Sequence, residues 1–447
     1  MTEMSDLLLS YYGDDFTGST DVMEALASSG IASVLFLGIP SPEMRARFKD
    51  SKAIGIAGTS RSETPEWMES QLTPAFEWLK SLDASICHYK VCSTFDSSPK
   101  VGSIGKAIEI GRAIFDQSIV PVIVGAPQLR RYTAFGNLFA AYQGSVYRID
   151  RHPVMSRHPV TPMSEADLAV HLSKQTTLPV SLVDLVTLAS SDADALVDAV
   201  ASKCPGILLI DVDSEPTQAA AGQQLVRLSR RTGSFVAGSS GIEYALINAW
   251  RKGGLTMGVA EFPTIGPVDR LAVVSGSVSP TTERQIRKAK EDGFADVALD
   301  PLALVSDDSE RSVEAAVRDG IERLKEGKSV ILHTALGPSA DVGNDIDRIS
   351  GARHKLGRAL GTILRQMVER EGLSRAVIAG GDTSSHALRQ LKVEALTTLI
   401  PLPQTPGSPL CLAHGSYRPT DGLQIALKGG QIGTDGYFAQ IRDGRTN

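Results

Sequence analysis

An excess of positive charge, paired cysteines and long apolar runs are all missing from this sequence, and each absence excludes a class of protein. Because 51 acidic side chains outnumber 45 basic ones, the net charge of −6 gives no overall attraction for nucleic acid or acidic lipid. No apolar stretch reaches the length of a membrane span, and no basic region precedes the first apolar run. The four cysteines are scattered, without a zinc spacing. We therefore expect a cytoplasmic protein with reduced thiols.

Several catalytic signatures are also missing. The sequence has no G-x-x-x-x-G-K-[ST] phosphate loop and no G-x-G-x-x-G after a predicted strand, which disfavours a dehydrogenase. It has no G-x-S-x-G elbow of a serine hydrolase. The histidines of the second half lack metal spacing, and we predict structural roles for them. These are His333, His354, His386 and His414.

The patterns that are present indicate an α/β protein with two domains. A chain of 447 residues exceeds what one core usually organises. Apolar strands alternate with amphipathic helices along its length, which is typical of mainly parallel sheets flanked by helices. Residues 251–267 carry glycine and proline without a clear period, so we place the linker there. The predicted domains are 1–250 and 268–447.

The first predicted strand ends in a loop with two adjacent carboxylates. An apolar run from Leu7 ends at Gly13, Asp14 and Asp15 follow, and a helical pattern begins at Asp21. In open α/β sheets, ligands bind beyond the carboxyl ends of strands, where this loop lies. We predict that Asp14 faces the ligand and that Asp15 braces the loop. The alternative is that one of them only caps the helix.

Two more loops of the first half carry candidate binding residues. Arg61 follows the predicted strand 53–58 and could hold a carboxylate bidentately, or it is an ordinary surface residue. Lys90 precedes a loop with Ser93 and Thr94, whose hydroxyls either close turns or bind a polyhydroxy acid. The stretch 148–158 is rich in arginine and histidine. It is either a solvated loop stiffened by prolines or an edge that handles anions.

Three loops in the second half combine glycine with hydroxyl groups after predicted strands, at 275–277, 380–384 and 428–433. Glycine lets the backbone approach a bulky anion, and backbone N–H groups at a helix start suit phosphate. Asp382 could bind Mg²⁺ directly or through water. We therefore predict a nucleotide site in this half. Its predicted residues are Ser277, Gly380, Gly381, Asp382, Thr383, Lys428, Gly429 and Gly430.

Taken together, these loops resemble the motifs of the four-carbon acid sugar kinases over nearly the whole chain. GDDFTGSTD at 13–21 is similar to the family's opening motif, and TSRS at 59–62 to its T-x-S-R segment. SGS at 275–277, GGDTS at 380–384 and KGGQIG at 428–433 resemble its later motifs. The combination in this order is specific, although any single motif would not be.

The resemblance implies an ATP-dependent kinase that acts on a short sugar acid or its 3-oxo form. One domain would hold the acid, the other would hold ATP and Mg²⁺, and an active-site cleft would lie between them. A positioned carboxylate would accept the proton of the attacking hydroxyl, and we assign this role to Asp14. A homodimer is left open. The alternative from another class is a nucleotide-responsive binding protein without turnover, which would not need both Asp14 and Asp15.

One segment departs from the family's usual K-x-D-S-T-L-R-G. The sequence has KVCSTFDS at 90–97, so Cys92, Asp96 and Ser97 stand where the family carries Asp, Arg and Gly. A carboxylate in place of a guanidinium reverses the local charge. This change argues against the linear four-carbon acids and favours a branched sugar acid, such as the apiose-derived oxo acids of one branch of the family.

Overall fold

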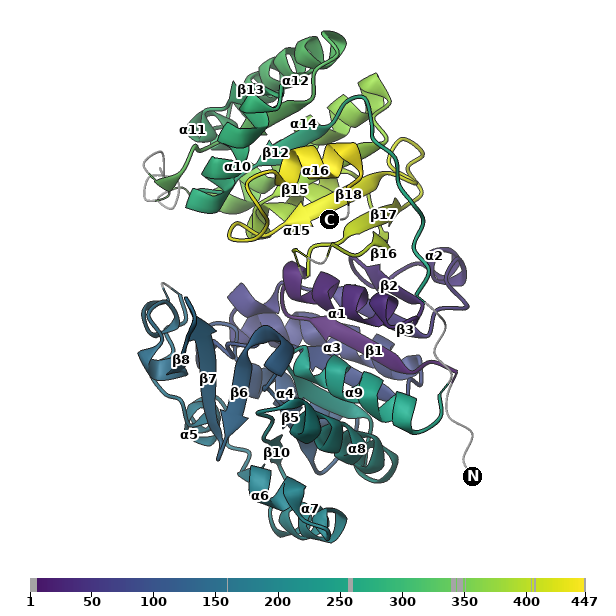
Figure 1. The fold of residues 1–447 in the computed structure, drawn as a ribbon, viewed down its shortest axis with the longest axis vertical. Helices are drawn as coiled ribbons and strands as arrows, with labels where there is room; N and C mark the ends of the chain where they lie inside the picture. Colours follow the sequence, from purple (N-terminus) through teal and green to yellow (C-terminus); the bar gives the residue numbers. More distant parts are fainter. Residues whose placement is uncertain are drawn as a thin grey trace. The chain divides into compact units, whose positions relative to one another are not determined.

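The computed structural model describes residues 6–158, 160–255, 260–338, 343, 349, 351–402, 404–405 and 407–445. The chain divides into two compact units (Figure 1). Unit 1 comprises residues 1–33 and 50–260, and unit 2 comprises residues 34–49 and 261–447. A segment from the N-terminal part of the sequence thus has its contacts in unit 2.

Unit 1 is built on a parallel sheet with the strand order β3-β1-β4-β11-β5-β10-β9. The strands of that sheet are β1 (Leu9–Gly13), β3 (Ala53–Ala57), β4 (Ile86–Lys90), β5 (Val120–Ile123), β9 (Val180–Val183), β10 (Ile207–Ile210) and β11 (Phe235–Gly238). The helices are α1 (Phe16–Ser28), α3 (Pro65–Ser81), α4 (Ile104–Ile114), α5 (Leu168–Ser173), α6 (Leu185–Ala189), α7 (Ala193–Lys203), α8 (Glu215–Thr232) and α9 (Gly241–Lys252).

Helices cover both faces of this sheet, and the alternation of side chains along each strand decides what each face receives. On one face, Tyr12 of β1 stacks on Tyr89 of β4 and contacts Phe76 of α3 edge-on. On the other face, the Tyr11 hydroxyl donates to the Ser19 carbonyl of α1 at 3.3 Å. Lys90 alternates with Tyr89 and therefore lies on the face of α1. The sheet thus carries an aromatic core on one side and a cation on the other.

A small antiparallel sheet interrupts unit 1 and was not predicted from the sequence. Its strands are β6 (Arg131–Ala134), β7 (Asn137–Tyr142) and β8 (Ser145–Arg148), paired in that order. Short 3₁₀ turns flank it, η2 at Pro127–Leu129, η3 at Ile149–Arg151 and η4 at Met155–Arg157. The arginine- and histidine-rich stretch 148–158 therefore begins at the end of β8 and continues through η3 and η4.

Unit 2 has a mixed sheet with the order β13-β14-β12-β15-β18-β17-β16-β2. The pairings from β13 to β18 are parallel and those from β18 to β2 are antiparallel. The strands are β2 (Ser33–Phe36), β12 (Ala272–Ser275), β13 (Ala295–Ala298), β14 (Val330–His333), β15 (Arg375–Ala379), β16 (Ala395–Ile400), β17 (Leu410–His414) and β18 (Gln424–Lys428). The helices are α2 (Pro42–Ala46), α10 (Pro280–Glu291), α11 (Pro301–Val305), α12 (Ser309–Lys325), α14 (Ala352–Glu371), α15 (Gly381–Gln390) and α16 (Tyr437–Asp443).

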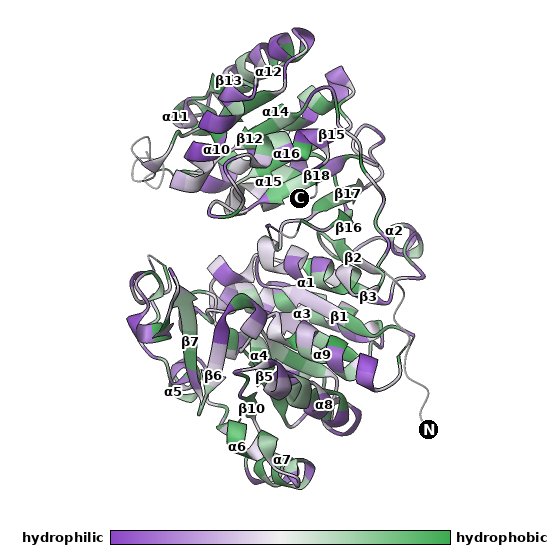
Figure 2. Ribbon diagram, in the orientation of Figure 1, coloured by the Kyte–Doolittle hydropathy of each residue, from purple (hydrophilic) through white to green (hydrophobic). Residues whose placement is uncertain are grey.

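Each unit has its own hydrophobic core. In unit 1, Phe76 and Ile108 from helices pack with Val122 and Phe235 from the sheet, and all four side chains are buried. A separate cluster in unit 2 joins strands β12, β14 and β15 to α10 and α16. Figure 2 shows strands such as β10 as hydrophobic, whereas the helices mix both kinds of residue. Burial of the strands on both faces explains their continuous apolar runs.

The predicted α/β class with mainly parallel sheets and flanking helices is confirmed. One element boundary differs from the prediction. The helix expected to open at Asp21 begins at Phe16, because Asp15 caps it. Strand β2, which lies between α1 and β3 in the sequence, pairs antiparallel with β16 in unit 2. Among the described residues, no helix is long and apolar enough to cross a membrane.

Candidate active site

The carboxyl ends of neighbouring strands in unit 1 lie level with one another. Gly13 of β1 is in register with Ala57 of β3 and Lys90 of β4, and Lys90 is in register with Gly238 of β11. Because these strands are parallel, the loops that follow them leave the sheet at one edge. The predicted catalytic and substrate-binding residues in those loops are Asp14, Asp15, Arg61, Ser93 and Thr94. Ser93 is half-buried and Thr94 is buried.

Asp15 caps helix α1, as the alternative interpretation of the two aspartates predicted for one of them. Its backbone is extended (φ −136°, ψ 166°), and Oδ1 accepts from the Gly18 N–H at 2.7 Å. Its carbonyl accepts from the Ser19 N–H at 3.1 Å and the Ser19 hydroxyl at 2.6 Å. Oδ2 accepts instead from Arg61 Nη1 at 3.1 Å. Asp15 therefore fixes the start of the helix and a neighbouring loop at once.

Asp14 is buried and keeps one carboxyl oxygen without a partner. Its N–H donates to the Lys90 carbonyl at 2.8 Å, and its carbonyl accepts from the Arg61 N–H at 3.0 Å. These backbone bonds hold the residue, while Oδ1 has no hydrogen-bond partner among the described residues. Burial, and then the charge of Asp15, raise the pKa of Asp14 to about 8. Such a carboxyl group suits proton transfer with a bound alcohol.

The glycines of the GDDFTGS motif are required by close approaches in this loop. A Cβ on Gly13 would lie 1.9 Å from the Ser19 hydroxyl oxygen. A Cβ on Gly18 would lie 2.5 Å from Asp15 Oδ1 and 3.0 Å from Lys90 Nζ. The spacing of the motif therefore follows from how tightly the first turn of α1 packs against the end of β1.

Arg61 and Asp96 form a partly buried ion pair beside Asp15. Arg61 Nη2 donates to both carboxylate oxygens of Asp96, at 3.0 and 2.9 Å. Asp96 also accepts from the hydroxyls of Thr94 at 2.6 Å and Thr161 at 3.0 Å. Burial would raise the pKa of Asp96, but Arg61 and the Thr94 hydroxyl outweigh it, and the pKa is lowered. The carboxylate that replaces the family's arginine is thus ionised and bound internally.

Lys90 is a buried cation beneath the Asp14–Asp15 loop. Its Nζ donates to the Val91 carbonyl at 3.0 Å. Burial would lower the pKa of Lys90, but the carboxylates of Asp21, Asp15 and Asp14 outweigh it and raise the pKa. Lys90 therefore supplies a permanent positive charge next to the two adjacent aspartates.

Sequence reasoning missed a polar layer behind this loop. The Ser240 hydroxyl donates to the Asp21 carboxylate, which joins the start of α9 to α1. His88 Nδ1 lies 2.5 Å from Glu243 Oε1, and His88 Nε2 lies 3.0 Å from the Gly238 carbonyl. Because the carbonyl only accepts, Nε2 carries a proton. Single polar residues within apolar strands and helices give no local signal that they meet in space.

The arginine- and histidine-rich stretch 148–158 contributes mainly to local structure. Arg148 Nε donates to Asp150 at 2.7 Å. His152 Nδ1 accepts from backbone N–H groups two and three residues further on, at 3.2 and 3.1 Å. The far end of the stretch does approach the Arg61–Asp96 pair. His158 Nδ1 accepts from the Thr161 N–H at 3.1 Å, and the Thr161 hydroxyl donates to Asp96. The stretch therefore reaches the candidate site through Thr161.

The predicted nucleotide loops of unit 2 also share one edge. Ser275 of β12 is in register with Ala379 of β15, which is in register with Lys428 of β18. The loops after these parallel strands therefore lie side by side. The Ser277 hydroxyl accepts from the Thr282 hydroxyl at 3.0 Å. This bond ties the 275–277 loop to the first turn of α10.

Lys428 lies at the centre of two of these loops and is fully buried. Its Nζ donates to the Gly429 carbonyl at 2.8 Å and to the Thr282 hydroxyl at 3.1 Å. Burial lowers the pKa of Lys428 to about 8. A Cβ on Gly430 would lie 3.0 Å from the Ser277 hydroxyl oxygen, so this glycine allows the loops to touch. The result is a compact frame with a buried cation, which suits phosphate.

The third loop opens helix α15. Gly380 has φ 122°, a conformation that favours glycine, and Gly381 begins the helix. Gly381 is exposed, and a Cβ built on it would meet no atom within 4 Å. The side chains of Asp382 and Thr383 lie outside the described residues, so their predicted contacts stay predictions.

Two family models match the chain, one on each side of the predicted linker. A sugar-binding N-terminal domain matches residues 9–246, and a nucleotide-binding C-terminal domain matches residues 272–438. A Paraburkholderia graminis protein named 3-oxo-isoapionate kinase is 46% identical, over 98% of this chain and 95% of its own length. The chain belongs to the four-carbon acid sugar kinase family. The family resemblance and the predicted sugar-acid kinase are thereby confirmed.

Other members are more distant. A Methylobacterium radiotolerans protein named 3-oxo-tetronate kinase is 29% identical over 98% of this chain and 99% of its own length. A solved Haemophilus influenzae structure of family DUF1537 matches with a TM-score of 0.73 at 23% identity, covering 97% of this chain and 99% of that one. It supports the fold. The nucleotide-binding domain supports the prediction of ATP as the cofactor.

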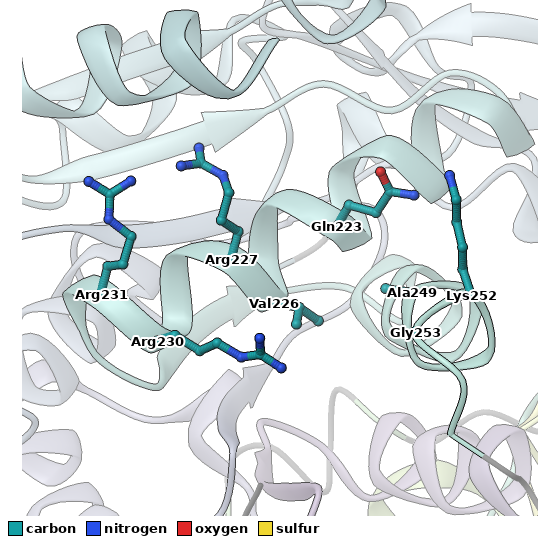
Figure 3. Close-up of a pocket in the computed structure, with 8 residues that line it drawn as sticks. All are labelled: Gln223, Val226, Arg227, Arg230, Arg231, Ala249, Lys252 and Gly253. Atoms are coloured by element: carbon teal, nitrogen blue, oxygen red, sulfur yellow. The ribbon is translucent and has the colours of Figure 1, made fainter. Parts of the chain in front are cut away.

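A basic groove in unit 1 lies away from the carboxyl edge of its parallel sheet. It has a volume of about 490 Å³ and lies between the later turns of α8 and α9 (Figure 3). Both helices start at the carboxyl edge of the sheet, so their later turns lead away from it. Two of its cations, Arg227 and Arg231, donate to Asp198 at 2.7 and 2.6 Å. Cations near helix carboxyl ends complement the helix dipole, and we assign no ligand here.

Replacing Asp14 by Asn should change how stability depends on pH. Asp14 has a pKa of about 8 when folded, against an ordinary value of 3.8, so the folded state retains a proton that the unfolded state releases. Its contribution is complete below pH 4 and is lost as the pH rises to about 8. We therefore expect the free energy of unfolding in urea of the wild type, minus that of Asp14→Asn, to fall steadily from pH 5 to pH 8.

Asp150→Asn provides the control for this measurement. The Arg148 hydrogen bond lowers the pKa of Asp150, so this carboxylate is ionised in both states above pH 5. The difference in free energy of unfolding between the wild type and Asp150→Asn should stay constant from pH 5 to pH 8. A flat difference for Asp14→Asn as well would show that Asp14 titrates normally.

Gly381→Val should weaken ATP binding without disturbing the fold. The new side chain would enter open space at the start of α15, where the phosphate groups are predicted to lie. Calorimetry should show at least a roughly tenfold loss of ATP affinity, about 1.4 kcal/mol. Gly38→Val is the control in unit 2, because its Cβ would also meet no atom within 4 Å. Equal ATP affinity in both variants would remove the 380–384 loop from the nucleotide site.

Proposed function

We propose that this chain transfers the γ-phosphoryl group of ATP to a hydroxyl group of a branched 3-oxo sugar acid of the isoapionate type. The observation that carries the proposal is the 46% identity to a 3-oxo-isoapionate kinase over 98% of the chain, against 29% to a 3-oxo-tetronate kinase. The same substrate class was the alternative that the altered segment at 90–97 favoured. The ionised carboxylate of Asp96 in that segment supports a site unlike that of the linear acids.

On the acceptor side, the chemistry needs a base for the attacking hydroxyl and positive charge around the reacting groups. As the oxygen–phosphorus bond forms and the bond to ADP breaks, the hydroxyl proton passes to Asp14 Oδ1, which is buried and has no hydrogen-bond partner among the described residues. Lys90 lies beside the loop as a cation, and Ser93 and Thr94 border it. Arg61 borders the same site. Asp15 braces the loop by capping α1.

On the donor side, the loops after β12, β15 and β18 hold the nucleotide through backbone N–H groups and hydroxyls. Within the described residues, no group of three or more His, Cys, Asp or Glu is gathered to hold a metal ion. In kinase sites, Mg²⁺ is bound by the substrate phosphates and by one or two carboxylates. Asp382 is the proposed protein ligand. Mg²⁺ would neutralise charge on the transferred group.

Four further proposals rest on the sequence and its family resemblance. These are the division into domains 1–250 and 268–447, an active-site cleft between them, a homodimer and a cytoplasmic location. Closure of such a cleft would exclude water from the transfer, which is the physical reason that kinases of two domains close.

A coupled assay of the purified chain with Mg²⁺ and ATP tests the proposed substrate. We expect kcat/KM for 3-oxo-isoapionate to exceed that for 3-oxo-tetronate by about 10- to 100-fold, the discrimination available from a few contacts. Equal efficiency would reduce the proposal to a general sugar-acid kinase. If neither acid supports ATP turnover although ATP still binds, the result would favour the binding protein without turnover.

Asp14→Asn should lower kcat by about 10²–10⁴ while ATP affinity stays unchanged, because it keeps the shape of the side chain and removes the base. Steady-state kinetics should also show kcat/KM of the wild type rising with pH up to about 8, as Asp14 ionises. Asp15→Asn is the matched variant. If Asp15→Asn is inactive and Asp14→Asn retains activity, the base is Asp15. If both retain near-normal kcat, the base lies elsewhere.

A further inference from the structure

Arg61 does not present a free guanidinium fork at the candidate site. Nη1 donates to Asp15 at 3.1 Å, and Nη2 donates to both oxygens of Asp96 at 3.0 and 2.9 Å. The arginine side chain is 27% exposed, whereas that of Asp96 is fully buried. A substrate carboxylate gripped bidentately needs two parallel N–H donors, and both terminal nitrogens of Arg61 already have carboxylate partners.

The charge around Arg61 also opposes a further anion. One guanidinium faces two carboxylates, Asp15 and Asp96, and the pKa of Asp96 is lowered, so that group is ionised. An incoming sugar-acid carboxylate at Arg61 would therefore have to share one guanidinium with two protein carboxylates in a partly buried setting, where charges interact strongly. Arg61 is better placed to hold protein carboxylates than to hold a substrate.

Asp96 is itself fixed from three directions. Besides Arg61, the Thr94 hydroxyl donates to Oδ1 at 2.6 Å and the Thr161 hydroxyl donates to Oδ2 at 3.0 Å. Thr161 lies 65 residues further along the chain, beyond the antiparallel hairpin. His158, whose charge acts on the Asp96 carboxylate, accepts from the Thr161 N–H at 3.1 Å. Asp96 therefore joins three segments that are distant in the sequence.

We propose that Arg61 is a positioning residue, and that Asp96 and Thr161 set its position for the phosphoryl transfer proposed above. Asp96 anchors the guanidinium, which in turn holds Asp15 at the cap of α1. The backbone N–H of Arg61 also donates to the Asp14 carbonyl at 3.0 Å, so one residue touches both members of the carboxylate pair. This inference rests on the proposed function, and it replaces the predicted role of Arg61 as the substrate-carboxylate ligand.

A double-mutant cycle in the kinetics separates the two roles. If Arg61 positions the loop, Arg61→Ala and Asp96→Asn each lower kcat about tenfold or more with KM within about threefold, and the double variant is no worse than the poorer single one. If Arg61 binds the substrate, Arg61→Ala raises KM by about 10- to 100-fold, and Asp96→Asn leaves KM unchanged or lowers it by freeing the guanidinium. That second result would overturn the proposal.

Four further variants sharpen the cycle. Thr161→Val should lower kcat in the same direction as Asp96→Asn, and Thr161→Ser should restore it because the hydroxyl is kept. Arg61→Lys keeps a charge but cannot span both carboxylates, so it should resemble Arg61→Ala in kcat. Asp150→Asn removes the partner of Arg148 near the hairpin and should leave the kinetics unchanged. Loss of kcat in Asp150→Asn equal to that in Asp96→Asn would indicate a general structural effect and overturn the proposal.

Urea unfolding of the wild type, the two single variants and the double variant tests this inference separately from the proposed function, because it needs no substrate. Arg61 and Asp96 are in contact, so their effects on the unfolding constant should be strongly non-additive. Additive effects would show that the pair does not act as a unit and would overturn the inference, whatever the substrate. If the wild type phosphorylates no short sugar acid but the unfolding effects are non-additive, the pairing stands and the proposed function fails.

Discussion

The candidate site of unit 1 depends on a chain of charges that runs from Asp96 through Arg61 to Asp15. Asp15 uses one carboxylate oxygen to cap α1 and the other to accept from Arg61, whose second nitrogen is held by Asp96. A helix N-terminus, a strand end and a distant loop thereby share one set of hydrogen bonds. Such a network is stable only if each buried charge has its partner, because unpaired buried charges are very costly.

This chain of charges leaves Asp14 in a different state from its neighbour. The Asp15 carboxylate has two partners, whereas backbone hydrogen bonds hold Asp14, and its buried Oδ1 has no partner in the part of the chain that the structure describes. Burial and the nearby charge of Asp15 then raise the pKa of Asp14 to about 8. Two adjacent residues of the same type so acquire different chemistry, because alternation along the extended backbone sends them into different surroundings.

Parallel pairing explains why both units place their motifs at a sheet edge. The register of β1 with β3 and β4, and of β15 with β12 and β18, brings loops that are far apart in sequence together. In unit 2 this brings Lys428 into contact with Thr282. The family's glycines then follow from contact distances, as at Gly13, where a Cβ would collide with Ser19.

Strand and helix periodicity, the turn residues and the motif order were enough to predict an α/β chain, its family and the residues that follow the strands of unit 1. These features are local, and local sequence records them directly. The pairing of β2 with β16, the hairpin 131–148 and the contact of Thr161 with Asp96 were not predictable in this way. They join residues far apart in the chain through burial and charge pairing, so only the tertiary structure decided them, along with the partners of Arg61.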